Sequence, residues 1–144
     1  MVDQALLKEV KEKMEAGAAA ADVKDTLKVY ELFKQVAEEN DDLKEELEDM
    51  DITIQMNITD ADAKFWLKAH DGTMEFGEGV VDNPSFTFSA TKEVASGMLF
   101  GEVDATSAYM AGDITVEGNL QDAMAFQEII ELALEALEDM FEDL

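Results

Sequence analysis

The chain has 144 residues, of which 35 are acidic and 10 are lysine, and it contains no arginine, so its formal net charge is −25. This charge excludes nucleic acid and anionic bilayers as partners, because neutralising phosphates requires clustered Lys or Arg. Cysteine is absent, which excludes disulfides and thiol chemistry.

The length favours one domain with a sizeable core. The chain start lacks a basic, apolar segment with a small-residue cleavage site, and no apolar run reaches about 18 residues. We therefore expect a cytoplasmic protein without stable membrane insertion. The acidity has two interpretations: a solvated surface that keeps the protein soluble and monomeric, or adaptation to a salty cytoplasm.

Helical periodicity dominates the first 50 residues. Asp3 can cap a first helix that ends at Gly17, and an alanine run then leads to a second amphipathic helix from Asp25 onward. Asn40 begins a short third helix that turns Leu43 inward and carboxylates outward. Those carboxylates lack the spacing of a calcium loop, so a solvated face is expected and no metal site.

The period then changes from helical to two residues. Apolar side chains alternate with polar ones in segments that we interpret as strands: Ile52–Ile58, Phe65–Ala69, Met74–Phe76, Phe86–Ala90 and Ile114–Val116. An Asp71-Gly72 pair between the second and third segments indicates a hairpin. Strands with one apolar face predict an α+β fold: a five-stranded, largely antiparallel sheet covered on one face by helices.

Three further helices follow the fourth strand. Thr91 can cap a helix over 92–100, and Asp104 can cap a short helix over 105–111 that Gly112 ends. Gly118 ends the last strand, and Asn119 with Asp122 favours a capping box at the start of a long helix. That helix carries a broad apolar stripe.

The stretch GEVDATSAYMAGDITVEG (101–118) resembles the signature of the sterol-carrier-protein lipid-transfer domain. The matching positions are Gly101, Asp104, Ala108, Gly112, Ile114, Val116, Gly118 and then Ala123. The resemblance continues upstream through FWLKAHDG and SFTFSAT, over roughly residues 29–137. We accordingly divide the chain into a helical extension, 1–24, and a lipid-binding domain, 25–144. The family usually has Lys after the glycine equivalent to Gly112, and here the residue is Asp113.

The resemblance implies a hydrophobic tunnel between sheet and helices. Methionine and phenylalanine suit such a lining because they adapt to irregular apolar ligands. The residues expected to line it are Met74, Phe76, Phe86, Phe88, Met98, Phe100, Met110, Ile114, Met124, Ile130 and Leu134. For any one of them, ordinary core packing is the alternative.

Catalytic side chains are scarce. His70, the single histidine, is expected on an exposed hairpin, where a general base lacks a pocket. Together with the resemblance, which implies lipid binding, this scarcity predicts a non-enzymatic carrier, without a cofactor, for a long-chain acyl, isoprenoid or sterol-like lipid. The alternatives are an accessory module that supports or presents lipid to a partner enzyme and, more remotely, an enzyme of the open α+β cone type. A monomer is expected, with a dimer as the alternative.

Overall fold

A five-stranded sheet with the order β3-β2-β1-β4-β5 forms the centre of the computed structural model, which describes residues 2–144. The strands are β1 (Asp51–Ile58), β2 (Ala63–His70), β3 (Thr73–Glu78), β4 (Phe86–Ala90) and β5 (Ile114–Gly118). The helices are α1 (Gln4–Ala16), the 3-10 turn η1 (Ala18–Ala20), α2 (Asp25–Glu39), α3 (Asp41–Glu48), α4 (Lys92–Leu99), α5 (Ala105–Ala111) and α6 (Leu120–Glu142).

The sheet is mixed. Neighbouring strands are antiparallel except for β1 and β4, which run parallel, with Ile54 opposite Leu67 on one side and Phe86 on the other. Strands β2 and β3 precede β4 in the chain and lie on one side of β1, and β4 pairs with the other edge of β1. The predicted fold class is confirmed, and the strand order places β4 and β5 together, away from β3.

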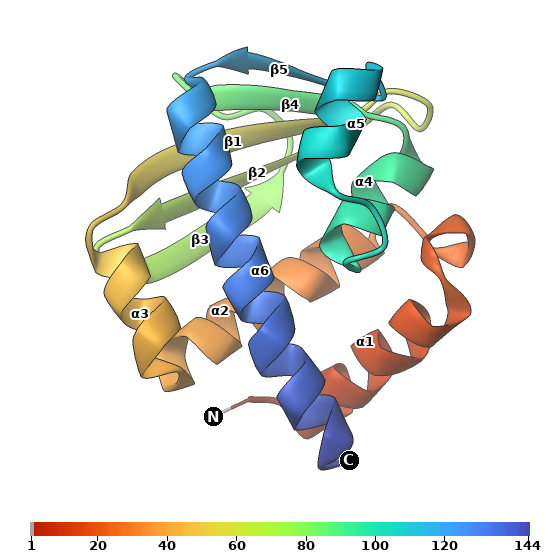
Figure 1. Cartoon of the computed structure of the whole chain (residues 1–144), viewed down its shortest axis with the longest axis vertical. Helices are drawn as coiled ribbons and strands as arrows, with labels where there is room; N and C mark the ends of the chain where they lie inside the picture. The colour runs from red at the N-terminus through yellow and green to blue at the C-terminus, as the bar shows by residue number, and fades with distance from the viewer. Residues whose placement is uncertain (1) are drawn as a thin grey trace.

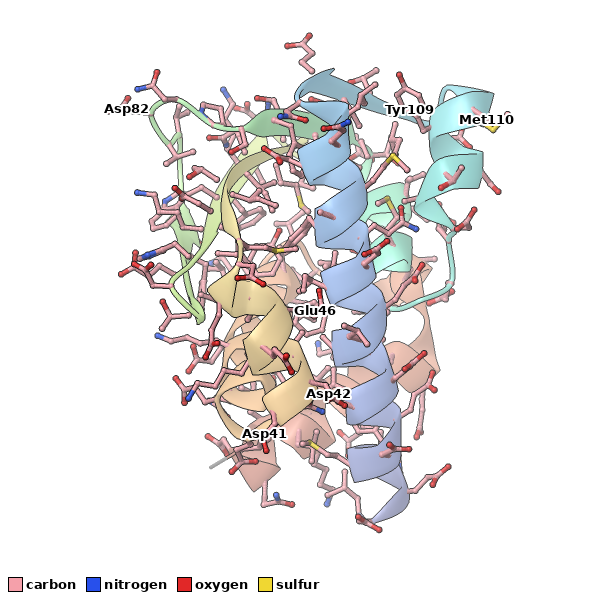
Figure 2. The ribbon with its side chains drawn as sticks, turned by 60° about the vertical axis from the view of Figure 1, so that its left-hand side comes forward. Asp41, Asp42, Glu46, Asp82, Tyr109 and Met110 are labelled. Carbon is pink, nitrogen blue, oxygen red and sulfur yellow. The ribbon has the colours of Figure 1, made fainter. Side chains whose placement is uncertain are left out.

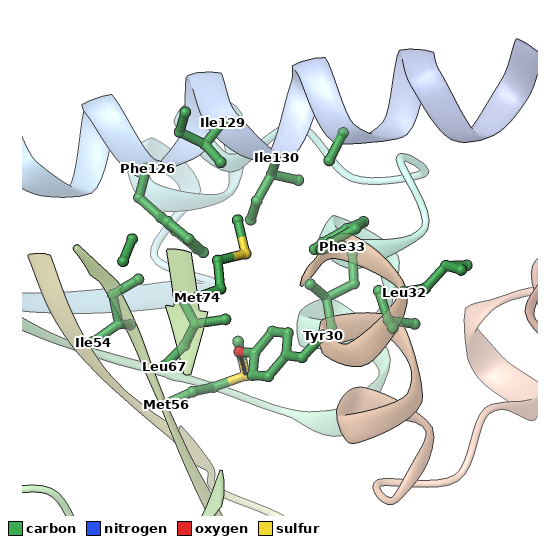
Figure 3. Close-up of a cluster of buried hydrophobic side chains, with 14 of the residues drawn as sticks. Tyr30, Leu32, Phe33, Ile54, Met56, Leu67, Met74, Phe126, Ile129 and Ile130 are labelled. Atoms are coloured by element: carbon green, nitrogen blue, oxygen red, sulfur yellow. Dashed lines mark hydrogen bonds between the residues drawn. The ribbon is translucent and has the colours of Figure 1, made fainter. Parts of the chain in front are cut away.

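The helices cover one face of the sheet, and α6 crosses in front of it (Figure 1). The alternation in the sequence sets this face, because Ile52, Ile54 and Met56 turn inward and are buried. Figure 3 shows the resulting core, in which Tyr30 and Phe33 of α2 lie opposite sheet residues and below α6. The Tyr30 hydroxyl donates to the Met56 sulfur (3.6 Å), and burial raises the Tyr30 pKa.

The helix starts follow the predicted capping residues. The carboxylate of Asp104 accepts from the Ser107 amide at 3.0 Å, and Asn119 Oδ1 accepts from the Asp122 amide at 3.1 Å. Only half of the predicted capping box forms, because the Asn119 amide donates instead to the carbonyl of Ser85 at 2.9 Å. That bond ties the start of α6 to the start of β4.

Two glycines are required where β5 begins and ends. Gly112 adopts the left-handed conformation with φ 82°, which ends α5 and turns the chain into β5. Gly118 has φ 109°, and a Cβ there would lie 2.6 Å from the Ser85 carbonyl oxygen. Both positions thus fix the short path from α5 through β5 to α6.

The N-terminal helix α1 packs against α2 and α6. Leu7 and Val10 are buried, the Asp3 amide donates to Gln35 Oε1 at 2.7 Å, and Lys11 Nζ donates to the Phe141 carbonyl at 3.3 Å. This agrees with an additional helix packed on the domain. The boundary between 24 and 25 stays a prediction.

Candidate functional site

An apolar cavity of about 500 Å³ lies between the β4–β5 half of the sheet and the helices α4, α5 and α6. Its size falls in the range of small-molecule and lipid pockets. Its floor includes Ile54 and Met56 of β1 and the inward side chains of β4 and β5. Residues 101–104 and α5 form one wall, and the first half of α6 forms the opposite wall.

The wall formed by 101–104 is held against α4 at Gly97. The Gly97 carbonyl accepts from the amides of Glu102 (2.7 Å) and Val103 (3.0 Å). The Val103 side chain lies directly over Gly97, where an added Cβ would approach Val103 Cγ2 to 2.5 Å. Gly97 therefore permits the close packing that places Val103 and the start of α5 beside the cavity.

The structure brings most of the predicted lining residues together. Those that line the cavity are Phe86, Phe88, Met98, Ile114, Met124, Ile130 and Leu134. Phe86 also packs against Phe126 of α6 with ring centroids 6.4 Å apart. These residues come from β4, β5, α4 and α6. The strand order places β4 beside β5.

Four predicted lining residues lie elsewhere. Met74 is 1% exposed in the core, and Phe76 packs edge-on against Tyr30 with centroids 6.1 Å apart. Both belong to β3, at the opposite edge of the sheet from β4 and β5. Phe100 packs against the core at the end of α4 without lining the cavity, and Met110 is 82% exposed on the outer side of α5.

Several lining residues were missed. Met56 and Val116 lie in the alternating strands, and Phe126 lies in the apolar stripe of α6, so the sequence patterns could have found them. Val103 and Tyr109 had no such signal, because they lie in a loop and a seven-residue helix whose orientation depends on packing at Gly97.

The cavity opens between α5 and the first turns of α6. Large apolar side chains are exposed at this mouth: Tyr109, Leu120 and Met124, the last with 69% of its surface accessible. Figure 2 shows Tyr109 on the side of α5 that faces α6, with Met110 on the other side. An open cavity is what the structure shows, and its continuation as a tunnel stays a prediction.

The charged residues at the cavity are all acidic among the described residues that line it: Glu102, Asp104 and Glu131. Glu102 Oε2 accepts from the Ala18 amide at 2.9 Å, which ties η1 to this wall. Hydrogen bonds from the Ser107 hydroxyl and amide lower the pKa of Asp104, so that carboxylate stays ionised at neutral pH.

His70 lies outside this site, on the β2–β3 hairpin. Its ring nitrogens contact Asp71 (3.4 Å) and Glu75 (3.2 Å), and bonds to Glu75 and then Asp71 raise its pKa. Within residues 2–144, no group of three or more His, Asp or Glu residues is arranged to hold a metal ion. None of the helices in that range is long and apolar enough to cross a membrane.

The family model of the SCP-2 sterol transfer family matches residues 33–131. The chain belongs to this family. The match covers the whole sheet and all of the cavity lining except Leu134, and it confirms the resemblance inferred from residues 101–118. No curated protein sequence matches the chain.

Solved structures of SCP-2 proteins share the fold at low sequence identity. The ubiquinone synthesis protein UbiJ-SCP2 aligns with a TM-score of 0.64 and 15% identity over 75% of this chain and 94% of its own. Apo sterol carrier protein 2 from Yarrowia lipolytica aligns with a TM-score of 0.59 and 15% identity, covering 74% of this chain and 89% of that one.

A larger protein contains the same fold. The sec-alkylsulfatase Pisa1 from Pseudomonas sp. aligns with a TM-score of 0.55 and 16% identity over 60% of this chain. The aligned part is only 14% of the sulfatase. The SCP-2 fold therefore occurs both as nearly a whole chain and as a small part of an enzyme.

Proposed function

We propose that this SCP-2 protein is a non-enzymatic carrier that holds the tail of a long-chain acyl, isoprenoid or sterol-like lipid. The cavity carries the proposal, because its floor and walls are built mainly of aliphatic, aromatic and methionine side chains. Burying a hydrocarbon tail there is favourable by about 0.8 kcal/mol per methylene. The aliphatic and methionine side chains at the mouth give the tail an apolar entry.

The absence of a reactive constellation beside the cavity supports a carrier. Nucleophilic catalysis needs a nucleophile within reach of a base, and the one histidine of the chain, His70, is on a distant hairpin. The polar lining residues are carboxylates, Gln127 and hydroxyls of α5. These groups suit recognition of a ligand head.

Filling the cavity tests the carrier function. Ala123 lines the cavity, whereas Ala125, two residues further along α6, is also half-buried but lies outside the lining. We expect Ala123→Phe to weaken binding of a pyrene-labelled alkyl alcohol at least tenfold, because the ring occupies the space for the tail. Ala125→Phe is the matched control, and its affinity for the labelled alcohol should be close to that of the unchanged protein. Equal binding by both variants, with cooperative melting retained, would contradict the proposal.

An accessory role is the second candidate. Its support is that a structural neighbour is named as a ubiquinone synthesis protein and another is part of a sulfatase. In this role the protein would present lipid to a partner enzyme. A protein that purifies without lipid and captures one specific enzyme would favour this role over the carrier.

A further inference from the structure

Three side chains form a polar edge on the cavity: Asp104, Gln127 and Glu131. Gln127 Nε2 donates to Glu131 Oε1 at 3.4 Å. The Ser107 hydrogen bonds lower the pKa of Asp104, and the proximity of the Gln127 side chain contributes to this lowering. The donors of the amide therefore point to carboxylates. What this edge offers a ligand is carboxylate oxygens and the Gln127 carbonyl oxygen, which are hydrogen-bond acceptors.

No lysine lines the cavity among the described residues, so the cations that an anionic head would need lie elsewhere. Lys92 Nζ donates to the carbonyls of Ala19 (3.2 Å) and Ala21 (2.5 Å), beyond the α4 wall. Lys64 and Lys68 extend from β2 on the face of the sheet opposite the cavity, which follows from their alternation with buried Phe65 and Leu67. None of the three lines the cavity.

The helix N-termini at the cavity each carry a capping side chain. Amides in the first turn of a helix are the usual alternative to Lys or Arg for binding an anion. In α5 the Ser107 amide donates to Asp104, and in α6 the Asp122 amide donates to Asn119. The Thr106 and Tyr109 hydroxyls remain as donors at the cavity, but they carry no charge to balance an anion.

We propose that the cavity selects a lipid whose head is a hydroxyl, and that it disfavours carboxylate and phosphate heads. This inference rests on the carrier function proposed above and specifies its ligand. A hydroxyl donates one hydrogen bond to the acceptors of the polar edge and accepts one from Tyr109 or Thr106. A carboxylate brings only acceptors and a negative charge beside Asp104 and Glu131, so its ionised form is destabilised.

Matched ligands test this proposal. Tetradecanol and tetradecanoate share a tail length, so their difference reports the head alone. At about pH 8 and low salt, each should displace a pyrene-labelled alkyl alcohol, with tetradecanol effective at about tenfold lower concentration because nearby carboxylates repel the ionised acid. The gap should narrow as the pH falls towards about 5, where the acid binds in its neutral form.

Two double variants that remove the same charge show whether the preference for tetradecanol depends on the polar edge. The double variant Asp104→Asn and Glu131→Gln should bring the two ligands within about threefold of each other. Asparagine keeps the α5 cap, since it caps as well as aspartate. The double variant Glu135→Gln and Asp139→Asn removes the same charge from exposed positions of α6 outside the cavity, and should keep the tenfold gap.

The outcomes separate this inference from the carrier function. Failure of the pyrene-labelled probe to bind the unchanged protein overturns both. Probe binding with tetradecanoate equal to or tighter than tetradecanol at low salt overturns the head selection and leaves the carrier function intact. A gap that both double variants reduce equally would show that net charge sets it, which overturns the role of the polar edge.

Discussion

At the scale of single residues, burial depends on loops that the local pattern does not show. Gln55 belongs to the polar face of β1, yet it is 4% exposed because residues 79–81 fold over it. Its Nε2 donates to the carbonyls of Phe65 (3.1 Å) and Gly79 (3.0 Å), and its Oε1 accepts from the Val81 amide (2.8 Å). One side chain thus joins β2, β1 and the loop after β3.

Replacing Gln55 with leucine should therefore destabilise the protein. The substitution leaves the half-buried Val81 amide and Gly79 carbonyl without their partner. An unsatisfied buried group costs about 1–3 kcal/mol, so we expect a loss near the lower end, about 1 kcal/mol. Urea denaturation measures the loss. Thr53→Val, on the same face of the same strand, is the control and should change stability by less than about 0.5 kcal/mol. Unchanged stability of Gln55→Leu would show that the loop is not held by this side chain.

His70 predicts a dependence of stability on pH. Its pKa is raised by the hydrogen bonds to Glu75 and Asp71, so the protonated form is favoured by folding. The stabilisation is fully present below the unfolded pKa of about 6.5 and is lost as the pH rises through the folded value. His70→Gln should lower the melting temperature slightly near pH 5.5 and leave it unchanged near pH 8.5. A difference of the same size at both pH values would contradict this account.

At the scale of elements, the periodicity of the sequence predicted the strands and helices. It could not predict which strands lie beside one another in the sheet. Met74 and Met124 were both predicted to line the lipid site, because each is a flexible apolar residue. The strand order separates them, because β3 joins the far edge of β2 while β4 pairs in parallel with β1. That pairing is a long-range contact without a turn signal. The predicted residues of β5 and α6 lie together at the cavity because residues 101–118 lead directly from α5 through β5 to α6, and those of β4 join them because β4 pairs with β5.

The helix α1 contributes to the core, although the family match begins at residue 33. Leu7 is buried between α1 and its neighbours, so Leu7→Ala should cost about 2–4 kcal/mol through lost burial and the cavity left behind. Chemical denaturation gives the value. Lys8→Ala, an exposed neighbour, should have almost no effect. A Leu7→Ala variant as stable as Lys8→Ala would mean that α1 is not docked in solution.

At the scale of the whole molecule, the excess of negative charge is the main electrostatic feature of the folded state. With 35 acidic residues and 10 lysines, most carboxylates cannot be paired with a lysine. Lys13 and Lys28 form ion pairs with Asp25 and Glu9 where α1 meets α2. Elsewhere, carboxylates repel one another across solvent, so the folded state carries a self-repulsion that salt reduces.

Sodium chloride should therefore raise the melting temperature. The Debye length falls from about 10 Å at 0.1 M to about 3 Å at 1 M, which screens the repulsion between exposed carboxylates. Calorimetry at neutral pH should show a clear rise over this range. The rise should shrink near pH 4, where many carboxylates are protonated. A flat or falling melting temperature at neutral pH would show that self-repulsion does not limit the stability of the folded state. It would also remove adaptation to high salt as an explanation of the acidity.

The proposed carrier function requires that the cavity between β4, β5 and α6 holds a lipid tail. Native mass spectrometry of the protein, purified without added lipid and then incubated with tetradecanol, tests it most directly. We expect a one-to-one adduct of a long-chain species on the unchanged protein and on Ala125→Phe, and its loss from folded Ala123→Phe. A bare protein under all of these conditions, or an adduct that Ala123→Phe retains in full, would contradict the account.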